Sequence, residues 1–226
     1  MENESPVNPI PALIIVLCLI ATGIELTFSA AEAGLIGGQR GIGWRVAAIQ
    51  DYAFSPAVWD WMVTRSDYDL DLLKRFVTYP FFHGSFTSAL FGIALLLALG
   101  KFVAEVFGEM QTFALFLLTT VLGALIFALL IDGQQPLYGM FPPVYGLIGA
   151  YTYVIWLRLG QTGQNQLAAF RLIGILLGLQ LVFGLLFGGA PTWVAEIAAF
   201  VVGFGASTLL APGGWAALVA RLRQRR

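Results

Sequence analysis

Three ionisable side chains stand within or beside long apolar stretches of this 226-residue chain: Glu25, His83 and Glu196. An ionisable group at membrane depth costs about 2.5–3.5 kcal/mol on insertion scales, so each is a candidate functional residue. A carboxyl group can hold or deliver a proton, and His83, the single histidine, can act as a general base. The alternative is structural: an interfacial histidine at the outer boundary, and two hydrogen-bonded carboxyl groups.

A serine nucleophile paired with His83 is not expected. Ser85 is two residues away, and residues two apart on a helix do not face each other. Ser88, five residues on, points roughly 140° away around the helix. The lone cysteine, Cys18, lies in an apolar run, and we find neither metal-ligand spacing nor a cofactor motif. We therefore expect no metal and no cofactor.

Transmembrane helices must position these residues. Apolar residues make up 58% of the chain and charged residues 11%, with a net charge of −1, so no basic surface for nucleic acid is expected. Six segments are long and apolar enough to cross a bilayer: 10–31, 81–102, 112–131, 143–157, 172–187 and 193–210. We predict an all-α integral membrane protein of one domain, 1–226, with an aromatic-rich interfacial loop at 32–79 and a basic tail at 213–226.

The distribution of basic residues predicts the orientation. Lys101, Arg158 and Arg171 fall on the same side as the arginine-rich tail, whereas the short loops 132–141 and 188–192 contain no Lys or Arg. The positive-inside rule then places both termini in the cytoplasm. Short loops favour a bacterial inner membrane.

Small residues at a spacing of four predict close helix packing. They occur at the inner end of the second span and along the sixth, with matching glycines on the fourth. The residues are Gly100, Ala104 and Gly108; Ala195, Ala199 and Gly203; and Gly146 and Gly149. We expect the fourth and sixth spans to pack tightly against each other.

Three blocks of sequence, in order and at the right spacing, resemble the rhomboid family of intramembrane serine proteases. The blocks are Arg75, Thr78, Phe82 and His83-Gly84-Ser85-Phe86; Tyr145-Gly146 followed by Trp156-Leu157-Arg158; and Ala195-Glu196-Ile197-Ala198-Ala199 with Gly203. The resemblance covers roughly residues 73–210. It implies a six-span bundle with a long outer loop after the first span.

At the positions that carry the chemistry of the family, the resemblance breaks down. The nucleophilic serine position holds Tyr145, and the histidine that serves as base is replaced by Glu196. The positions at which the family has the His and Asn that assist the oxyanion hold Ser88 and Gly92 in this chain. The resemblance therefore implies degenerate sites, and we expect Tyr145 to donate a hydrogen bond to Glu196, cross-linking the fourth and sixth spans.

The leading hypothesis for function is binding without cleavage. Rhomboid-like proteins without the catalytic pair recognise transmembrane segments of client proteins, and a polar cavity formed by His83, Ser85, Ser88, Tyr145 and Glu196 could take part. Membrane lipids are the other expected partners. The alternatives are an endopeptidase with an unconventional site, and a small transporter or channel based on the buried acids. The sequence does not indicate an oligomeric state.

Overall fold

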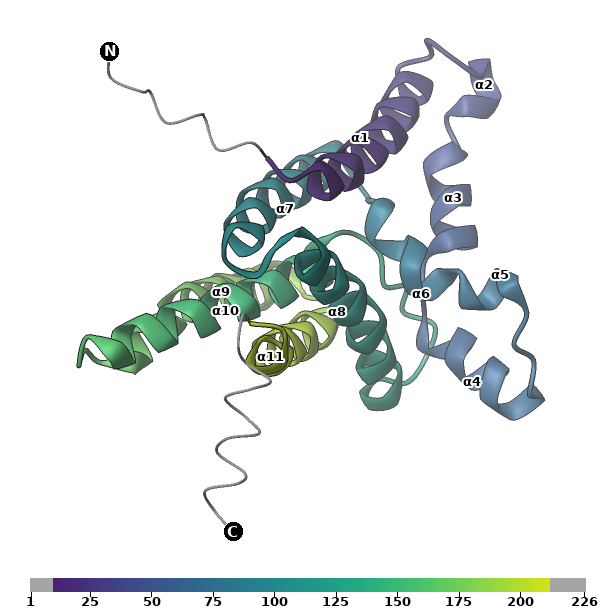
Figure 1. The fold of residues 1–226 in the computed structure, drawn as a ribbon. Helices are drawn as coiled ribbons and strands as arrows, with labels where there is room; N and C mark the ends of the chain where they lie inside the picture. The colour runs from purple at the N-terminus through teal and green to yellow at the C-terminus, as the bar shows by residue number, and fades with distance from the viewer. Residues whose placement is uncertain (1–9, 212–226) are drawn as a thin grey trace, which may run out of the picture.

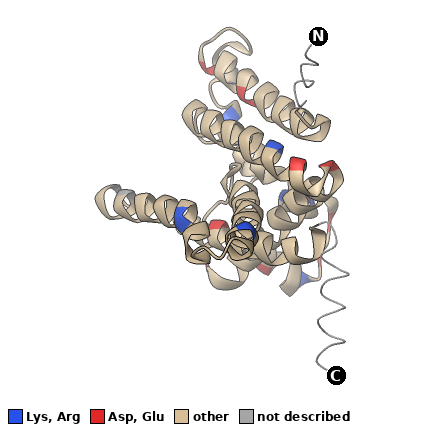
Figure 2. Ribbon diagram, turned by 60° about the vertical axis from the view of Figure 1, so that its left-hand side comes forward, with Lys and Arg blue, Asp and Glu red and all other residues tan. Residues whose placement is uncertain are grey.

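The long helices follow the apolar segments of the sequence. The computed structural model describes residues 10–211, so the predicted basic tail lies outside the described residues. The long helices are α1 (Ala12–Glu32), α7 (Phe86–Phe107), α8 (Glu109–Leu130), α9 (Phe141–Gln161), α10 (Arg171–Phe187) and α11 (Trp193–Leu210). They are almost free of charged residues (Figure 2), as helices that cross a lipid bilayer must be. The chain is an all-α membrane protein.

Five helices meet the length and hydropathy of a membrane span: α1, α7, α8, α11, and α10 together with the 3-10 turn η2 (Gln166–Phe170) before it. The more polar α9 does not, although the sequence predicts six spans. Residues 142–150 of α9 are all buried by other helices. A helix enclosed in this way needs little apolar surface for lipid, which explains its more polar sequence.

Two long helices start three or more residues away from the start that the sequence predicts, and the other four start within two residues of it. α7 begins at Phe86 instead of residue 81, because the segment before it forms a 3-10 turn, η1 (Tyr79–Phe81). Ser85 then caps α7, its Oγ accepting a hydrogen bond from the Ser88 amide at 3.2 Å. α8 begins at Glu109 instead of residue 112, directly after Gly108, whose φ of 93° favours glycine.

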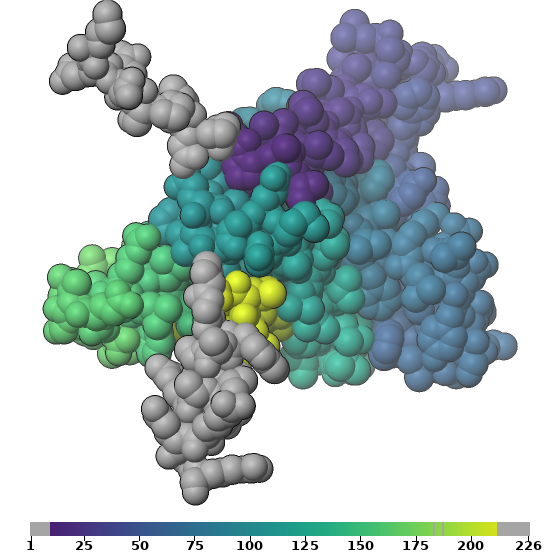
Figure 3. Space-filling view, viewed as in Figure 1, coloured from purple at the N-terminus to yellow at the C-terminus, as the bar shows by residue number. Residues whose placement is uncertain are grey.

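The loop after α1 folds into five short helices. They are α2 (Gly38–Gly41), α3 (Trp44–Tyr52), α4 (Pro56–Arg65), α5 (Leu70–Leu73) and α6 (Arg75–Thr78). They lie together on one side of the bundle, away from α9 and α10 (Figures 1 and 3). Arg75 joins α6 to α3, since its Nη1 donates to the Gln50 and Ala53 carbonyls at 2.8 and 2.9 Å. The loop is therefore a structured part of the protein.

Glycines bring α9 and α11 into backbone contact. A Cβ atom on Gly149 would collide with the Phe200 carbonyl oxygen, and one on Gly203 would collide with the Gly146 carbonyl oxygen. A Cβ on Gly146 would also collide with Thr119 of α8. Small residues allow such approach between helices in lipid, where packing contacts drive association. The close packing of α9 and α11 fixes the positions of Tyr145 and Glu196.

Candidate functional site

Tyr145 lies near the N-terminal end of α9 and Glu196 in the first turn of α11. Their exposed fractions are 5% and 6%, so both side chains are inside the bundle. Ala195 and Ala199 flank Glu196 on α11 and are fully buried. Ala199 also approaches α8, because a Cβ added to Gly123 would lie 3.2 Å from the Ala199 Cβ. The carboxyl group is therefore held by a closely packed backbone.

The partner of Glu196 is Gln180 of α10. The Gln180 Nε2 donates to Glu196 Oε2 at 2.7 Å. No hydrogen bond joins Tyr145 to Glu196 among the described residues, so the expected cross-link between these two side chains is wrong. A tyrosine hydroxyl can only lie where its rigid ring is packed, whereas the glutamine side chain has three rotatable bonds and reaches the carboxyl from α10. Nothing in the pattern of residues indicated that Gln180 faces Glu196.

His83 is buried between η1 and α7, with 1% of its surface exposed. Its Nε2 accepts a hydrogen bond from the Met140 amide at 3.3 Å, so the proton is on Nδ1, which has no partner among the described residues. Burial lowers the pKa of His83 to about 4, against the opposing effect of the nearby Glu25 carboxylate. The imidazole is therefore neutral at pH 7.

The residues that the sequence groups with His83 do not form one hydrogen-bonded site with it in the described structure. A Cβ on Gly92 would lie 3.3 Å from His83 Nε2 and 3.0 Å from the Met140 Cβ, so this glycine makes room for the histidine contact. Ser85 and Ser88 form the cap of α7, and Ser85 is exposed. No hydrogen bond joins His83 to a serine, to Tyr145 or to Glu196 in the part of the chain that is described.

Glu25 forms a buried ion pair with Arg45, a residue that the sequence analysis missed. The Arg45 guanidinium donates to both Glu25 carboxylate oxygens, at 2.7 and 2.8 Å, and to Glu32 Oε1 at 2.6 Å. It also donates to the His83 carbonyl at 2.9 Å. The hydrogen bond to Glu25 raises the pKa of Arg45 above its ordinary value. An acid at membrane depth usually has a cationic partner, so Glu25 itself was the feature of the sequence that could have led to Arg45.

The remaining small residues differ in their contacts. Gly100 faces α1, where an added Cβ would lie 2.8 Å from Ile14 Cδ1. Ala104 is buried on α7. Gly108 is not part of a helix interface: it joins α7 to α8 with a positive φ. The predicted stripe of three residues therefore has two members on α7 and one in the turn after it.

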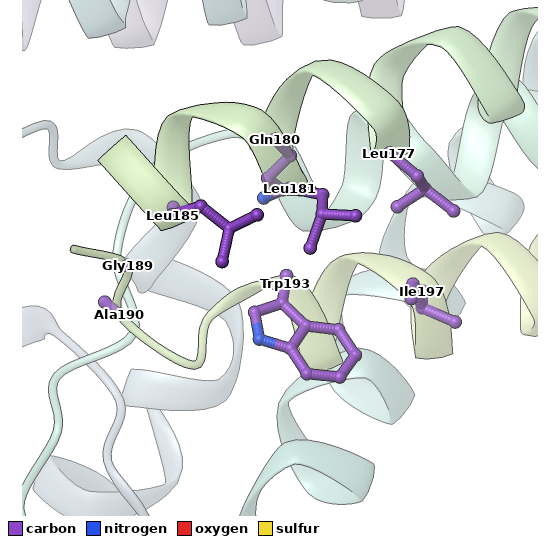
Figure 4. Close-up of a pocket in the computed structure, with 9 residues that line it drawn as sticks. Leu177, Gln180, Leu181, Leu185, Gly189, Ala190, Trp193 and Ile197 are labelled. Carbon is purple, nitrogen blue, oxygen red and sulfur yellow. The ribbon is translucent and has the colours of Figure 1, made fainter. Parts of the chain in front are cut away.

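A cavity of about 390 Å³ lies between α10 and α11 (Figure 4). Gln180, which lines it, donates the hydrogen bond to Glu196. Its walls are mainly apolar and include Leu177, Leu181, Leu185 and Ile197, with polar groups from the Gln180 amide and the Trp193 indole N–H. Within residues 10–211, no three carboxyl, thiol or imidazole groups are placed so that they could hold a metal ion. The cavity therefore offers apolar contact and hydrogen bonding.

The comparison with protein families supports the resemblance seen in the sequence. A family model described as Rhomboid domain matches residues 71–213. The match begins in α5 and includes every long helix except α1. No match to a curated protein was found.

Proposed function

Because the chain belongs to the rhomboid family, we propose that it is a member that binds transmembrane segments of client proteins without cleaving them. The observation that carries the proposal is the state of Glu196, which stands where the family resemblance places the histidine base. Its carboxyl group accepts from the Gln180 amide and has no hydroxyl nucleophile bonded to it in the described structure. The neighbouring Tyr145 stands at the serine position.

Serine protease chemistry needs a hydroxyl nucleophile within about 2.6–3.2 Å of a base, and donors aimed at the oxyanion. His83 is the only imidazole of the chain, and its Nε2 lone pair is used by the Met140 amide. Its Nδ1 carries the proton, so neither nitrogen is available as a base. In serine proteases the members of the site act as a unit, so their combined replacement removes the whole rate enhancement that they provide.

A binding role is supported by the space between α10 and α11. A transmembrane segment can reach this space from the bilayer, since α10 is mostly exposed along its length and Ile173 is its one buried residue among the side chains that are described. The apolar walls provide van der Waals contact, which is the main attraction between helices in lipid. We further propose that both termini are cytoplasmic, that the protein resides in a bacterial inner membrane, and that lipids cover the outer faces of the bundle.

The transporter alternative has less support than the sequence suggested. Its motivation was a pair of acids at membrane depth, Glu25 and Glu196. Arg45 neutralises Glu25, and both of its carboxylate oxygens accept from the guanidinium. Glu196 is then the one acid of the pair without a cationic partner among the described residues, and a single carboxyl group gives little support for an ion pathway.

The proposal is tested with the full chain in liposomes that also contain a fluorescently labelled, single-span rhomboid reporter substrate. Energy transfer measures binding and gel electrophoresis measures cleavage of the same reporter. We expect saturable binding with the reporter intact. The test variant is Gly178→Leu. It adds bulk on the exposed face of α10 and should weaken binding of the reporter. Cleavage, or energy transfer that does not saturate, would contradict the proposal.

A further inference from the structure

We propose that the cavity between α10 and α11 selects transmembrane segments that carry an amide hydrogen-bond donor at the depth of Gln180. This inference rests on the proposed function and adds the chemical feature that distinguishes one client segment from another. An asparagine side chain is the simplest group of this kind. It can donate to a free acceptor while its own oxygen accepts from a neighbouring amide.

Gln180 has an unsatisfied hydrogen-bond acceptor. The Gln180 Nε2 donates to Glu196, but the Gln180 Oε1 is buried and has no hydrogen-bond partner among the described residues. A buried carbonyl oxygen without a donor is costly, and most such groups in folded proteins have a partner. A ligand with a donor at this position would supply the missing bond.

The surroundings make this acceptor selective. Gln180 lines the cavity together with apolar side chains, among them Leu177, Leu181 and Ile197. A lipid acyl chain can fill apolar space but has no donor for the Gln180 oxygen. A transmembrane helix with a single amide can satisfy both the apolar walls and the acceptor. The hydrogen-bonding chemistry therefore favours a polypeptide over an acyl chain.

The surface of α10 also fits a helix. Gly174 and Gly178 are spaced by four residues and lie on the same face of α10 as Leu181 and Leu185, two residues of the cavity wall. No atom lies within 4 Å of a Cβ built on either glycine, so the space beside them is open. Small residues at this spacing allow a second helix to approach closely. The glycines therefore leave room for a helix beside the part of the cavity wall that Leu181 and Leu185 form.

The experiment uses the full chain in phosphatidylethanolamine–phosphatidylglycerol liposomes and single-span polyleucine peptides with lysine flanks. One peptide has asparagine in the second turn from the outer side, one has leucine there, and one has asparagine near the opposite end. A photocrosslinking amino acid replaces Leu181, which lines the cavity. The matched control replaces Leu179, which is 52% exposed and lies on the other side of α10.

We expect position 181 to crosslink the outer-asparagine peptide about three- to tenfold more than the other two at equal peptide concentration. Gln180→Leu should abolish this preference while the leucine peptide is still captured, and position 179 should show no preference. Equal capture of all three peptides by the natural chain would overturn the inference and leave the proposed function standing. Capture of none would overturn both, and crosslinks between two copies of the chain would assign the cavity to a second copy instead.

Discussion

Arg45 is the side chain on which the polar contacts of α1, α3 and the start of α7 converge. It contacts Glu25, Glu32 and the His83 carbonyl while only 6% exposed. Burying an ion pair is expensive, and removing one partner leaves an uncompensated charge in a medium that solvates it poorly. The pair therefore makes the position of the loop helix α3 depend on α1.

Replacing Arg45 should destabilise the protein strongly. We expect Arg45→Met to lower the free energy of unfolding by about 3–5 kcal/mol, because the Glu25 carboxylate remains buried without a partner. Arg40→Met is the control, since Arg40 is exposed on α2 and should change stability by less than about 0.5 kcal/mol. Denaturant unfolding in mixed micelles measures both. Equal stability of the two variants would show that the pair contributes nothing.

His83 should make stability depend on pH in a defined window. Burial lowers its pKa to about 4, whereas an unfolded histidine has a pKa of about 6.5. The folded state binds the proton less readily, so the contribution is complete above pH 6.5, falls as the pH drops toward 4, and amounts to about 3 kcal/mol in total. His83→Gln, whose oxygen can still accept from Met140, should lack this part of the pH dependence. Parallel curves for both proteins would contradict this assignment.

For single residues, the sequence identified the ionisable side chains in apolar segments but not the side chains that bind them. Glu25, His83 and Glu196 were recognisable because ionisable groups are rare in apolar segments. Arg45 lies in the loop after α1 and Gln180 on a different long helix, and hydrophobic periodicity says nothing about which side chains of distant segments meet. The partners of Glu25 and Glu196 therefore became visible only in three dimensions.

Among the helices, the contact between α9 and α11 is the one most sensitive to side-chain volume. Gly203→Ala should destabilise the protein by about 1–3 kcal/mol, because the added Cβ collides with the Gly146 carbonyl oxygen. Gly205→Ala on the same helix meets no atom within 4 Å and should be neutral or stabilising by up to about 1 kcal/mol. Thermal unfolding of the two variants under identical detergent conditions compares them. A Gly203→Ala variant as stable as Gly205→Ala would contradict the packing.

The long helices were more predictable than their ends. Apolar segments of about 20 residues are a strong signal. Small residues at spacing four on α11, with Gly146 and Gly149 on α9, indicated that these two helices pack closely. Hydropathy could not show that α7 begins only at Phe86, because the apolar residues of η1 lie only a few positions before it. It also could not show which contacts hold the loop, where Arg75 binds two backbone carbonyls.

For the whole molecule, the distribution of charge predicts the orientation in the membrane. We expect a membrane-impermeant maleimide to label Thr64→Cys, in α4, on intact cells, and to label Gln164→Cys, between α9 and η2, only after lysis. Both residues are exposed, and Cys18→Ala provides the cysteine-free background since Cys18 is the only native cysteine. Labelling of Gln164→Cys on intact cells would reverse the proposed orientation.

The central claim is that this rhomboid-family bundle binds a transmembrane segment but does not hydrolyse it. Its site combines Tyr145, Glu196 bonded to Gln180, and a histidine whose Nε2 is already engaged. These side chains can position a segment by packing and hydrogen bonding, and none of them forms an activated nucleophile.

The most direct measurement is mass spectrometry of a transmembrane reporter after prolonged incubation with the purified chain in liposomes. The account predicts an intact reporter with the natural chain and with His83→Ala, the latter serving to detect any rebuilt site on the second long helix. A reporter cleaved by the natural chain at one peptide bond, and left intact by His83→Ala, would contradict the account and identify the protein as a protease.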